Sequence, residues 1–330
     1  MRSRMRKGHV MDRMAELATI VNEPYAYLQS IKNQSGKKIV GTVCSYAPEE
    51  LIHAAGALPV RLFGSDAAGS HADLHLQSYC CSLVRGILGD ALAGRLNLLD
   101  GMVFPHTCDT IQRLSDVWRI NLPQTFHSDV VLPVKLDTPS ARQYLMDVLS
   151  KFVQELGVKL GHPVSDADLA RSVTLFNAIR ARLQRLDDLR RSYPSLLTGH
   201  DYHTIVRAAM IMEREAFLDV VSEITAGLEE NPPAQKAPNA KRLVLSGGIC
   251  SHPDIYDVIE NAGGVVVGDD LCTGSRYFDG IADENLPALA ALVKRVVERA
   301  VCPAKHAGLT GRADRLIRTV RNGRPAGLAG

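Results

Sequence analysis

The fold class follows from one stretch of the chain, residues 38–63, which reads KIVGTVCSYAPEELIHAAGALPVRLF. Its first part, 38–43, is a short apolar run that is typical of a buried strand. Residues 48–57 predict a helix, because a proline and two glutamates stand in what would be its first turn. A second apolar run, 58–63, predicts another strand. A strand, a helix and a strand in this order indicate the crossover unit of a parallel sheet.

The same alternation continues outward from this unit as far as residue 135. The sequence predicts helix, strand, helix and strand in turn, at 82–93, 101–104, 110–119 and 130–134. Such alternation predicts a parallel sheet with helices on its faces. The alternation restarts near the end of the chain, with strands expected at 242–245 and 265–267 and helices at 253–262, 286–301 and 312–320. Only two strands are predicted there, so the second sheet looks incomplete.

The middle of the chain is helical instead. Apolar residues recur at helical spacing in two stripes, 144–156 and 169–186. The second stripe follows a capping-box pattern over 165–168, which marks the start of a helix. A third helix is expected over about 202–227, and three prolines in 231–240 indicate a linker.

These patterns together predict an α/β fold class with two Rossmann-like parallel-sheet domains, the second incomplete, joined by a helical subdomain. The expected divisions are an N-terminal helical segment (1–35), a first α/β domain (36–138), the helical subdomain (139–230), the linker (231–241) and a partial second α/β domain (242–330).

The composition is that of a globular protein. Of 330 residues, 46% are apolar and 22% are charged, which excludes a disordered or collagen-like chain. A formal net charge of +2 argues against a nucleic-acid partner, because a dedicated binding domain would be strongly basic. No apolar run is long enough to span a bilayer, so no membrane association is expected either.

The N-terminus and the cysteines bear on the cellular compartment. Four basic residues stand within the first seven positions, but the apolar segment of a secretory signal does not follow them. We therefore expect a cytoplasmic protein. In that compartment the seven cysteines would be thiols or metal ligands rather than disulfides.

The cysteines are also the main candidates for chemistry. In open parallel sheets, ligands bind beyond the carboxyl ends of the strands. Four cysteines come just past a predicted strand, namely Cys44, Cys108, Cys250 and Cys272. The sequence has no C-x-x-C pair, no dinucleotide-binding glycine pattern and no Walker A motif. Two interpretations stay open: small buried side chains that pack the core, or thiolates gathered from separate loops to hold an iron–sulfur cluster.

Three motifs then carry a family resemblance. The first, 41–61, begins GTVCSYAPEELI; the second, 104–113, reads FPHTCDTIQR and is followed by Trp118; the third, 269–278, reads DDLCTGSRYF. In this order they resemble the hallmark motifs of the 2-hydroxyacyl-CoA dehydratase and benzoyl-CoA reductase family. The three motifs span most of the chain.

The resemblance implies an oxygen-sensitive subunit that holds a [4Fe-4S] cluster and pairs with a homologous second subunit as a heterodimer. It also implies an ATP-dependent iron–sulfur activator protein, which supplies a low-potential electron. In the dehydratases the electron converts the thioester carbonyl of a 2-hydroxyacyl-CoA into a ketyl radical that expels the hydroxyl group. The runner-up is a benzoyl-CoA reductase-type subunit, in which the electron enters an aromatic ring. A third interpretation is a cluster-less, non-catalytic partner subunit.

Carried over residue by residue, the resemblance implies two cluster ligands, Cys81 and Cys108, with Cys80 as the alternative to Cys81. It also implies that Cys44 lines the active-site cleft as a catalytic residue, with Ser45 and Glu49 near it. His106 and Asp109 flank a ligand and would tune the cluster through hydrogen bonds.

The remaining cysteines and the third motif receive other roles. Packing is the expectation for Cys250, Cys272 and Cys302, whereas Asp270, Thr273 and Arg276 would organise a cleft for the CoA or for the partner subunit. The family usually supplies a third cysteine ligand beyond the position of Cys302, and no cysteine follows Cys302 here. We therefore expect either a chain truncated at its C-terminus or a cluster-poor relative.

Overall fold

The computed structural model describes residues 2–65, 69–230, 240–250, 254–300, 302–308 and 310–323. Most of the expected linker and the last seven residues of the chain lie outside these ranges. Within them the fold is α/β, with parallel sheets and many helices, as the sequence predicts.

The first sheet has four parallel strands. They are β1 (Ile39–Thr42), β2 (Leu58–Arg61), β3 (Gly101–Pro105) and β4 (Phe126–Val130). Their spatial order is β2-β1-β3-β4, so the chain crosses over β1 between β2 and β3. The side chains of β1, β2 and β3 are all buried, as expected for a parallel sheet covered on both faces.

Short helices connect these strands. They are α3 (Glu49–Ala54), α4 (Gly69–Ala72), α5 (Ser82–Leu92) and α6 (Asp109–Asn121). Helix α5 contacts α6, so the two helices that follow Cys81 and Cys108 lie side by side. This contact becomes important for the candidate site.

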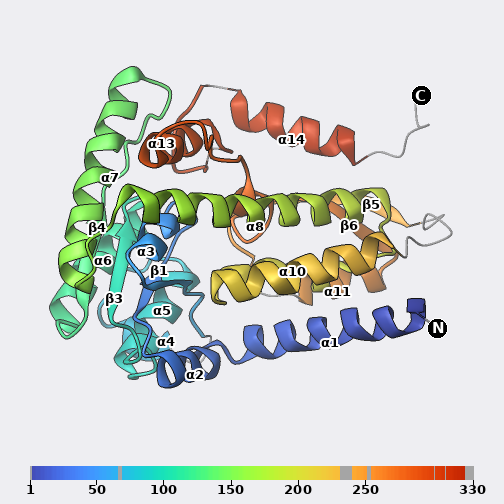
Figure 1. Ribbon diagram of the computed structural model, residues 1–330, viewed down its shortest axis with the longest axis horizontal. Helices are drawn as coiled ribbons and strands as arrows, with labels where there is room; N and C mark the ends of the chain where they lie inside the picture. Colours follow the sequence, from blue (N-terminus) through green and yellow to red (C-terminus); the bar gives the residue numbers. More distant parts are fainter. Residues whose placement is uncertain are drawn as a thin grey trace.

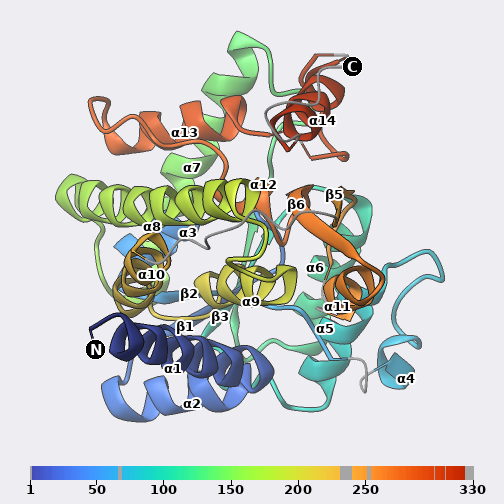
Figure 2. The same ribbon diagram turned by 90° about the vertical axis from the view of Figure 1, so that its right-hand side faces the viewer.

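Long helices form the body of the molecule beside the sheet (Figure 1). They are α1 (Arg2–Asn22), α2 (Pro24–Ser35), α7 (Pro139–Leu160), α8 (Asp166–Ser192), α9 (Gly199–Ala209) and α10 (Arg214–Glu229). Helix α8 contacts α3, which belongs to the first sheet's connections, and also β6 of the second sheet. It therefore bridges the two sheets. Figure 2 shows α1, α10 and α8 one above the other, and the contacts of α10 with both neighbours agree with this view.

The second sheet has two parallel strands, β5 (Lys241–Ser246) and β6 (Gly264–Asp270). Its helices are α11 (Asp254–Asn261), α12 (Ser275–Phe278), α13 (Ala288–Glu298) and α14 (Gly311–Asn322). Strand β6 is buried along most of its length, whereas β5 is partly exposed. Among the described helices, none combines the length and the apolar character needed to cross a bilayer.

Two elements differ from the expectation. The fourth strand runs over Phe126–Val130 instead of 130–134, because Phe126 pairs with Gly101 and fixes the register along β3. The helix expected over 202–227 is two helices, α9 and α10. It breaks because the carbonyl of Met210 turns aside to accept a hydrogen bond from the backbone N–H of Arg61 at the end of β2, at 2.9 Å.

Gly64 makes a close backbone approach that gives a testable prediction. Its φ is +70°, and a Cβ there would lie 2.6 Å from the backbone of Gly86 and Ile87 in α5. Replacement by alanine is therefore expected to cost about 3 kcal/mol of unfolding free energy, through backbone strain and a clash that no side chain can relieve. Gly36→Ala is the matched control: its φ is +65° but its Cβ meets nothing within 4 Å, so about 1 kcal/mol is expected. Urea denaturation midpoints measure the loss of stability in both variants. Equal losses at Gly64 and Gly36 would contradict the predicted clash.

Candidate functional site

The carboxyl ends of several strands meet at one place in the molecule. The turn after β1 contacts the turn after β6, where the Ser45 hydroxyl donates to the carbonyl of Cys272 at 3.1 Å. The segment after α13 contacts the turn after β3, where Lys305 Nζ donates to the carbonyl of His106 at 3.2 Å. This strand-end junction is where ligands bind in open α/β sheets, and it brings together thiols from separate loops.

Cys81 and Cys108 lie together at the edge of this junction. Cys81 is the N-cap residue of α5 and Cys108 is the N-cap residue of α6. The hydroxyl of Thr110 lies 3.3 Å from the Cys108 sulfur and 3.9 Å from the Cys81 sulfur. Each sulfur therefore stands at the start of a helix, where the backbone N–H groups of the first turn carry partial positive charge.

Cys80 is placed differently from its neighbour. Its side chain is buried and its sulfur lies 3.8 Å from the amide oxygen of Gln77, within its own turn. Cys81, by contrast, is exposed and its sulfur is directed toward the hydroxyl that Cys108 also contacts. The geometry thus favours Cys81 over Cys80 as the companion of Cys108.

Cys44 and Ser45 occupy the interior of the junction. The Cys44 thiol is buried and accepts a hydrogen bond from the Thr107 hydroxyl at 3.3 Å. Burial raises the pKa of Cys44 and keeps it a neutral thiol, although Arg61 acts in the opposite direction. Ser45 accepts a hydrogen bond from Arg61 at 3.2 Å, so it links a buried cation to the loop of Cys272.

Glu49 lies near Ser45 but is engaged in an ion network. Its carboxylate accepts a hydrogen bond from the Tyr277 hydroxyl at 2.9 Å and pairs with Arg214 at 3.4 Å. Glu49 and Ser45 line the same cavity, which holds only about 20 Å³. The structure therefore brings these two predicted residues together, with Glu49 held in place by partners far away in the sequence.

His106 and Asp109 take ordinary positions next to Cys108. His106 forms a 2.8 Å hydrogen bond with Asp129 on β4, and Asp129 also accepts from Ser115 at 2.5 Å. Asp109 is the first residue of α6 and is exposed, where its negative charge suits the helix dipole. Of these two residues, His106 is the one whose side chain is held by a hydrogen bond to a neighbouring strand.

Buried cations lie among the thiols, and the sequence had drawn attention to only one of them, Arg276. Lys305 is buried, and burial lowers its pKa, while the thiols Cys44, Cys302 and Cys108 act to raise it. Three arginines are also buried there, namely Arg61, Arg276 and Arg299. The resemblance had already assigned Arg276 to a cleft, but no local pattern marks Lys305 or Arg299, because an isolated Lys or Arg at a strand or helix end usually faces solvent.

Cys272 and Cys302 both contact the turn after β1: the carbonyl of Cys272 accepts from the Ser45 hydroxyl at 3.1 Å, and the backbone N–H of Cys302 donates to the Tyr46 hydroxyl at 3.2 Å. The neighbouring Cys302 and the buried arginines Arg276, Arg61 and Arg299 lower the pKa of Cys272, whereas burial acts to raise it. Cys272 follows β6, where strand ends were expected to carry chemistry. Cys302 follows the helix α13 instead, so no strand-end argument could have identified it.

Glu50, the neighbour of Glu49, supports a pH prediction. Burial alone would raise its pKa, but Arg180 and Arg295 lower it from 4.5 to about 2. Because the folded-state pKa is below the unfolded one, this stabilisation is present above about pH 4.5 and is lost as the pH falls toward 2. The shift corresponds to roughly 3 kcal/mol.

The unfolding free energy of the Glu50→Gln variant should therefore fall less between pH 5 and pH 2 than that of the wild type, measured by urea unfolding at each pH. The exposed Glu298, which pairs with Arg142 at 3.7 Å, provides the control Glu298→Gln with little change. If the unfolding free energy of Glu50→Gln fell as steeply with decreasing pH as that of the wild type, the prediction would be contradicted.

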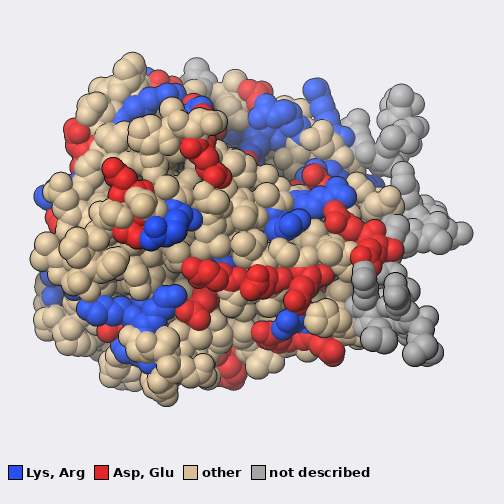
Figure 3. Space-filling view, in the orientation of Figure 1, with Lys and Arg blue, Asp and Glu red and all other residues tan. Residues whose placement is uncertain are grey.

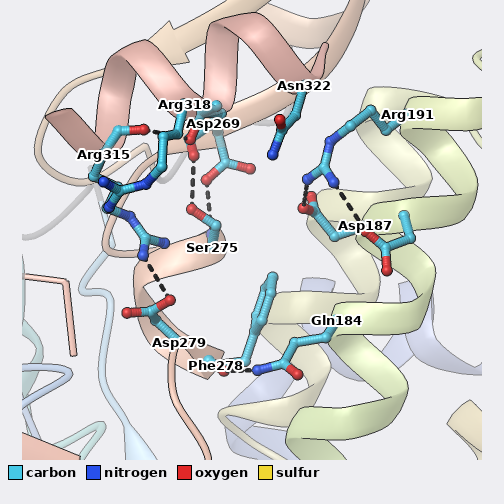
Figure 4. Close-up of a pocket in the computed structure, with 12 residues that line it drawn as sticks. Gln184, Asp187, Arg191, Asp269, Ser275, Phe278, Asp279, Arg315, Arg318 and Asn322 are labelled. Carbon is cyan, nitrogen blue, oxygen red and sulfur yellow. Dashed lines mark hydrogen bonds and ion pairs between the residues drawn. The ribbon is translucent and has the colours of Figure 1, made fainter. Parts of the chain in front are cut away.

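A larger cavity of about 360 Å³ lies between α8, α12 and α14 (Figure 4). Its charged groups are largely paired with one another: Arg191 with Asp187 and Asp188, and Arg315 with Asp279. None of the cysteines is among its described lining residues. The cavity is therefore separate from the thiol-rich junction, although two residues on its wall, Asp269 in β6 and Ser275 at the start of α12, flank the loop that carries Cys272.

Charges of both signs cover the face of the molecule shown in Figure 3. Acidic residues recur every four positions on α10, at Glu215, Asp219 and Glu223, and an acidic band crosses the face where α10 lies (Figures 1 and 3). Basic residues gather where α14 lies. The small net charge thus hides a local separation of charge.

Comparisons with known proteins show the family to which the sequence belongs. The family model for "2-hydroxyglutaryl-CoA dehydratase, D-component" matches residues 44–328. The chain is 23% identical over 280 residues to the (R)-phenyllactyl-CoA dehydratase beta subunit of Clostridium sporogenes, covering 85% of this chain and 74% of that protein. It is 25% identical over 264 residues to the beta subunit of the lactoyl-CoA dehydratase of Anaerotignum propionicum, covering 80% and 69%.

A third relative belongs to a reductase. The chain is 27% identical over 245 residues to a subunit of the benzoyl-CoA reductase of Thauera aromatica, covering 73% of this chain and 63% of that protein. Dehydratase and reductase subunits thus stand at similar distances. Because the family model matches most of its length, the chain belongs to the family of the 2-hydroxyglutaryl-CoA dehydratase D-component, which includes subunits of 2-hydroxyacyl-CoA dehydratases and of benzoyl-CoA reductase.

Proposed function

We propose that this chain is a subunit of an iron–sulfur 2-hydroxyacyl-CoA dehydratase. In the proposed reaction the thioester loses water through a ketyl radical, after one-electron reduction by an ATP-dependent activator. One observation carries the proposal. In this chain, which belongs to the family, the starts of α5 and α6 bring the thiols of Cys81 and Cys108 to the same hydroxyl, that of Thr110. Paired thiols at helix N-termini suit the soft, anionic coordination that iron in a [4Fe-4S] cluster requires.

The donor set fits such a cluster in part. Cys81 is exposed and Cys108 is half-buried, so a bulky inorganic group has access to both sulfurs. Within the described part of the chain, no group of three or more Cys, His, Asp or Glu side chains is arranged to hold one metal ion. In this proposal Cys81 and Cys108 therefore supply part of the ligand set, and the rest comes from Cys44 after rearrangement, from a partner subunit or from a non-protein ligand.

The protein's own residues prepare the site electrostatically. The N-termini of α5 and α6 place partial positive charge beside the two ligand positions, which suits an anionic cluster. Lys305, buried among Cys108, Cys302 and Cys44, places a positive charge beside them. When bound, the [4Fe-4S] cluster supplies low-potential electron transfer. His106, which is hydrogen-bonded to Asp129, stands two residues before Cys108 and would tune the cluster from there.

The proposed partners follow from the relatives. Those relatives are named as subunits of phenyllactyl-CoA and lactoyl-CoA dehydratases. For this chain we propose a 2-hydroxyacyl-CoA thioester as substrate, a homologous second subunit and an ATP-dependent iron–sulfur activator protein. The turn that holds Cys44 and Ser45 would face the cleft for the substrate.

Two other functions remain as alternatives. The similarity to a benzoyl-CoA reductase subunit favours a reductase-type role, and the reaction product separates the two: a dehydratase yields an enoyl-CoA with only catalytic amounts of reductant. The incomplete thiol set among the described residues favours a cluster-less partner subunit, and iron content separates that alternative from both enzymes.

The test is iron and acid-labile sulfide per chain after strictly anaerobic purification, alone and with a candidate partner subunit. Roughly four of each support a [4Fe-4S] cluster, and turnover of a 2-hydroxyacyl-CoA by the complex with an activator then supports the dehydratase. Iron near zero in both preparations would overturn the catalytic assignment and leave the non-catalytic partner as the better interpretation.

A further inference from the structure

Three cations at the strand-end junction are buried without a carboxylate partner among the described residues. Arg61 ends β2, and Arg299 and Lys305 follow α13. These residues are only 2%, 4% and 4% exposed. Within the described part of the chain their hydrogen bonds go to hydroxyl and carbonyl oxygens, and none of the three forms an ion pair. Buried positive charge of this kind is costly unless an anion lies close to it.

The two arginines hold the turn after β1 from two different elements. Arg61 donates a hydrogen bond to the Ser45 hydroxyl at 3.2 Å, and Arg299 donates to the Ser45 carbonyl at 2.8 Å. The Arg299 guanidinium group also lies 4.7 Å from the centre of the Tyr46 ring. The Nε atoms of both arginines are buried and have no hydrogen-bond partner within the described residues. Unbalanced positive charge therefore lies beside the turn that begins with Cys44.

Lys305 is held at the loop that joins two of the thiols. Its ammonium group donates to the carbonyl of His106 at 3.2 Å and to a carbonyl in the segment after β4 at 3.1 Å. The next residue after His106, Thr107, donates a hydrogen bond to the Cys44 sulfur at 3.3 Å. The residue after Thr107 is Cys108. The lysine is thus fixed to the short loop that contacts Cys44 and carries Cys108.

An iron–sulfur cluster would bring negative charge to this place. A cysteine binds iron as a thiolate, and one-electron reduction of a cluster adds one further negative charge. Charges interact more strongly in the poorly screened interior of a protein than in water. Cations that are already buried at the junction therefore favour the reduced cluster over the oxidised one.

We propose that Arg61, Arg299 and Lys305 are the counter-charges of the cluster, which retain it in the chain and stabilise its reduced form. They are positioning residues that act through charge and not as ligands. Their role depends on the proposed function, since it requires the cluster. Loss of one charge should therefore weaken the retention of iron and make the reduction potential of the cluster more negative.

The experiment uses the full-length chain, loaded anaerobically with iron and sulfide, and the variants Lys305→Gln, Arg299→Gln and Arg61→Gln. Glutamine keeps a hydrogen-bond donor but carries no charge. Each variant should lose its iron to a ferrous-iron chelator about tenfold faster than the wild type. Lys135→Gln is the matched control, because Lys135 forms a β-bridge with His306 beside the same segment but its side chain is 66% exposed. It should lose iron at the wild-type rate.

The second readout is the reduction potential, measured by a dye-mediated titration that follows the paramagnetic reduced cluster. It should be more negative in each glutamine variant and stay near the wild-type value in Arg61→Lys, which keeps the charge. A merely structural role would not give this pattern.

Wild-type potentials and iron-loss rates in the three glutamine variants, with circular dichroism showing an intact fold, would overturn this proposal and leave the proposed function standing. A wild-type chain that takes up no iron, alone or with a candidate partner subunit, would overturn both, so the two failures are distinguishable.

Discussion

Arg190→Met is expected to destabilise the protein by about 3–5 kcal/mol, the cost of leaving buried carboxylates without their charge partner. Arg190 on α8 is 1% exposed and bonds Asp187 on its own helix at 2.6 Å and Asp269 at the end of β6 at 2.5 Å. Its guanidinium group also lies 3.5 Å above the ring of Tyr202. Methionine keeps much of the side-chain volume, so the loss reports charge and hydrogen bonding.

The matched control is Arg185→Met on the same helix. Arg185 pairs with Glu229 at 2.5 Å, but both side chains are largely exposed. An exposed pair contributes little, so a change below about 1 kcal/mol is expected. The measurement is the urea midpoint of each variant at pH 7. Equal effects at the two arginines would contradict the interpretation.

Arg190 also positions the thiol loop. Asp269 accepts backbone hydrogen bonds from Ser275 at 2.7 Å and from Leu271 at 3.2 Å, on either side of Cys272. Loss of Arg190 should therefore loosen this loop before the protein unfolds globally. Hydrogen exchange should show faster exchange at residues 271–276 than at β1, whereas uniform acceleration would indicate a purely global effect.

Cys108→Ser and Cys81→Ser are each expected to remove most of the iron from the anaerobically purified chain. Serine keeps the size of the side chain, but its hydroxyl is a poor ligand for iron compared with a thiolate. Iron should fall from roughly four per chain to less than about one. The measurement is iron and acid-labile sulfide on protein of confirmed fold.

Cys80→Ser is the control for this prediction. Cys80 is adjacent to Cys81 in sequence, but it is buried and directed at Gln77 rather than at Thr110. Its replacement should leave the iron content unchanged. Loss of iron in Cys80→Ser with retention in Cys81→Ser would reverse the ligand assignment and show that α5 begins differently when the cluster is bound.

Local patterns were sufficient where short-range forces decide the structure. The stretch 38–63 predicted β1, α3 and β2, because apolar runs and a helix start depend on neighbouring residues. The capping box at Ser165 and Asp168 is present as expected. The start of α5 directly after Cys81 was likewise predictable, since the helix pattern begins at Ser82.

Local patterns failed where a distant element decides. The strand expected at 130–134 lies at Phe126–Val130, because pairing with β3 fixes its register. The helix expected at 202–227 breaks at Met210, because its carbonyl accepts a hydrogen bond from the backbone N–H of Arg61 at the end of β2. Neither β3 nor β2 is near these segments in sequence, so neither effect leaves a local signal.

The sequence by itself determined the α/β class, the family resemblance and the identity of the candidate thiols Cys44, Cys81 and Cys108. The tertiary structure alone decided that Cys81 and Cys108 meet at the hydroxyl of Thr110 and that the loop of Cys272 contacts Ser45. It also placed Lys305 among the thiols. The physical reason is that periodicity and capping act over one helical turn, whereas these meetings depend on how α5, α6, β6 and α13 pack, with α8 contacting both sheets.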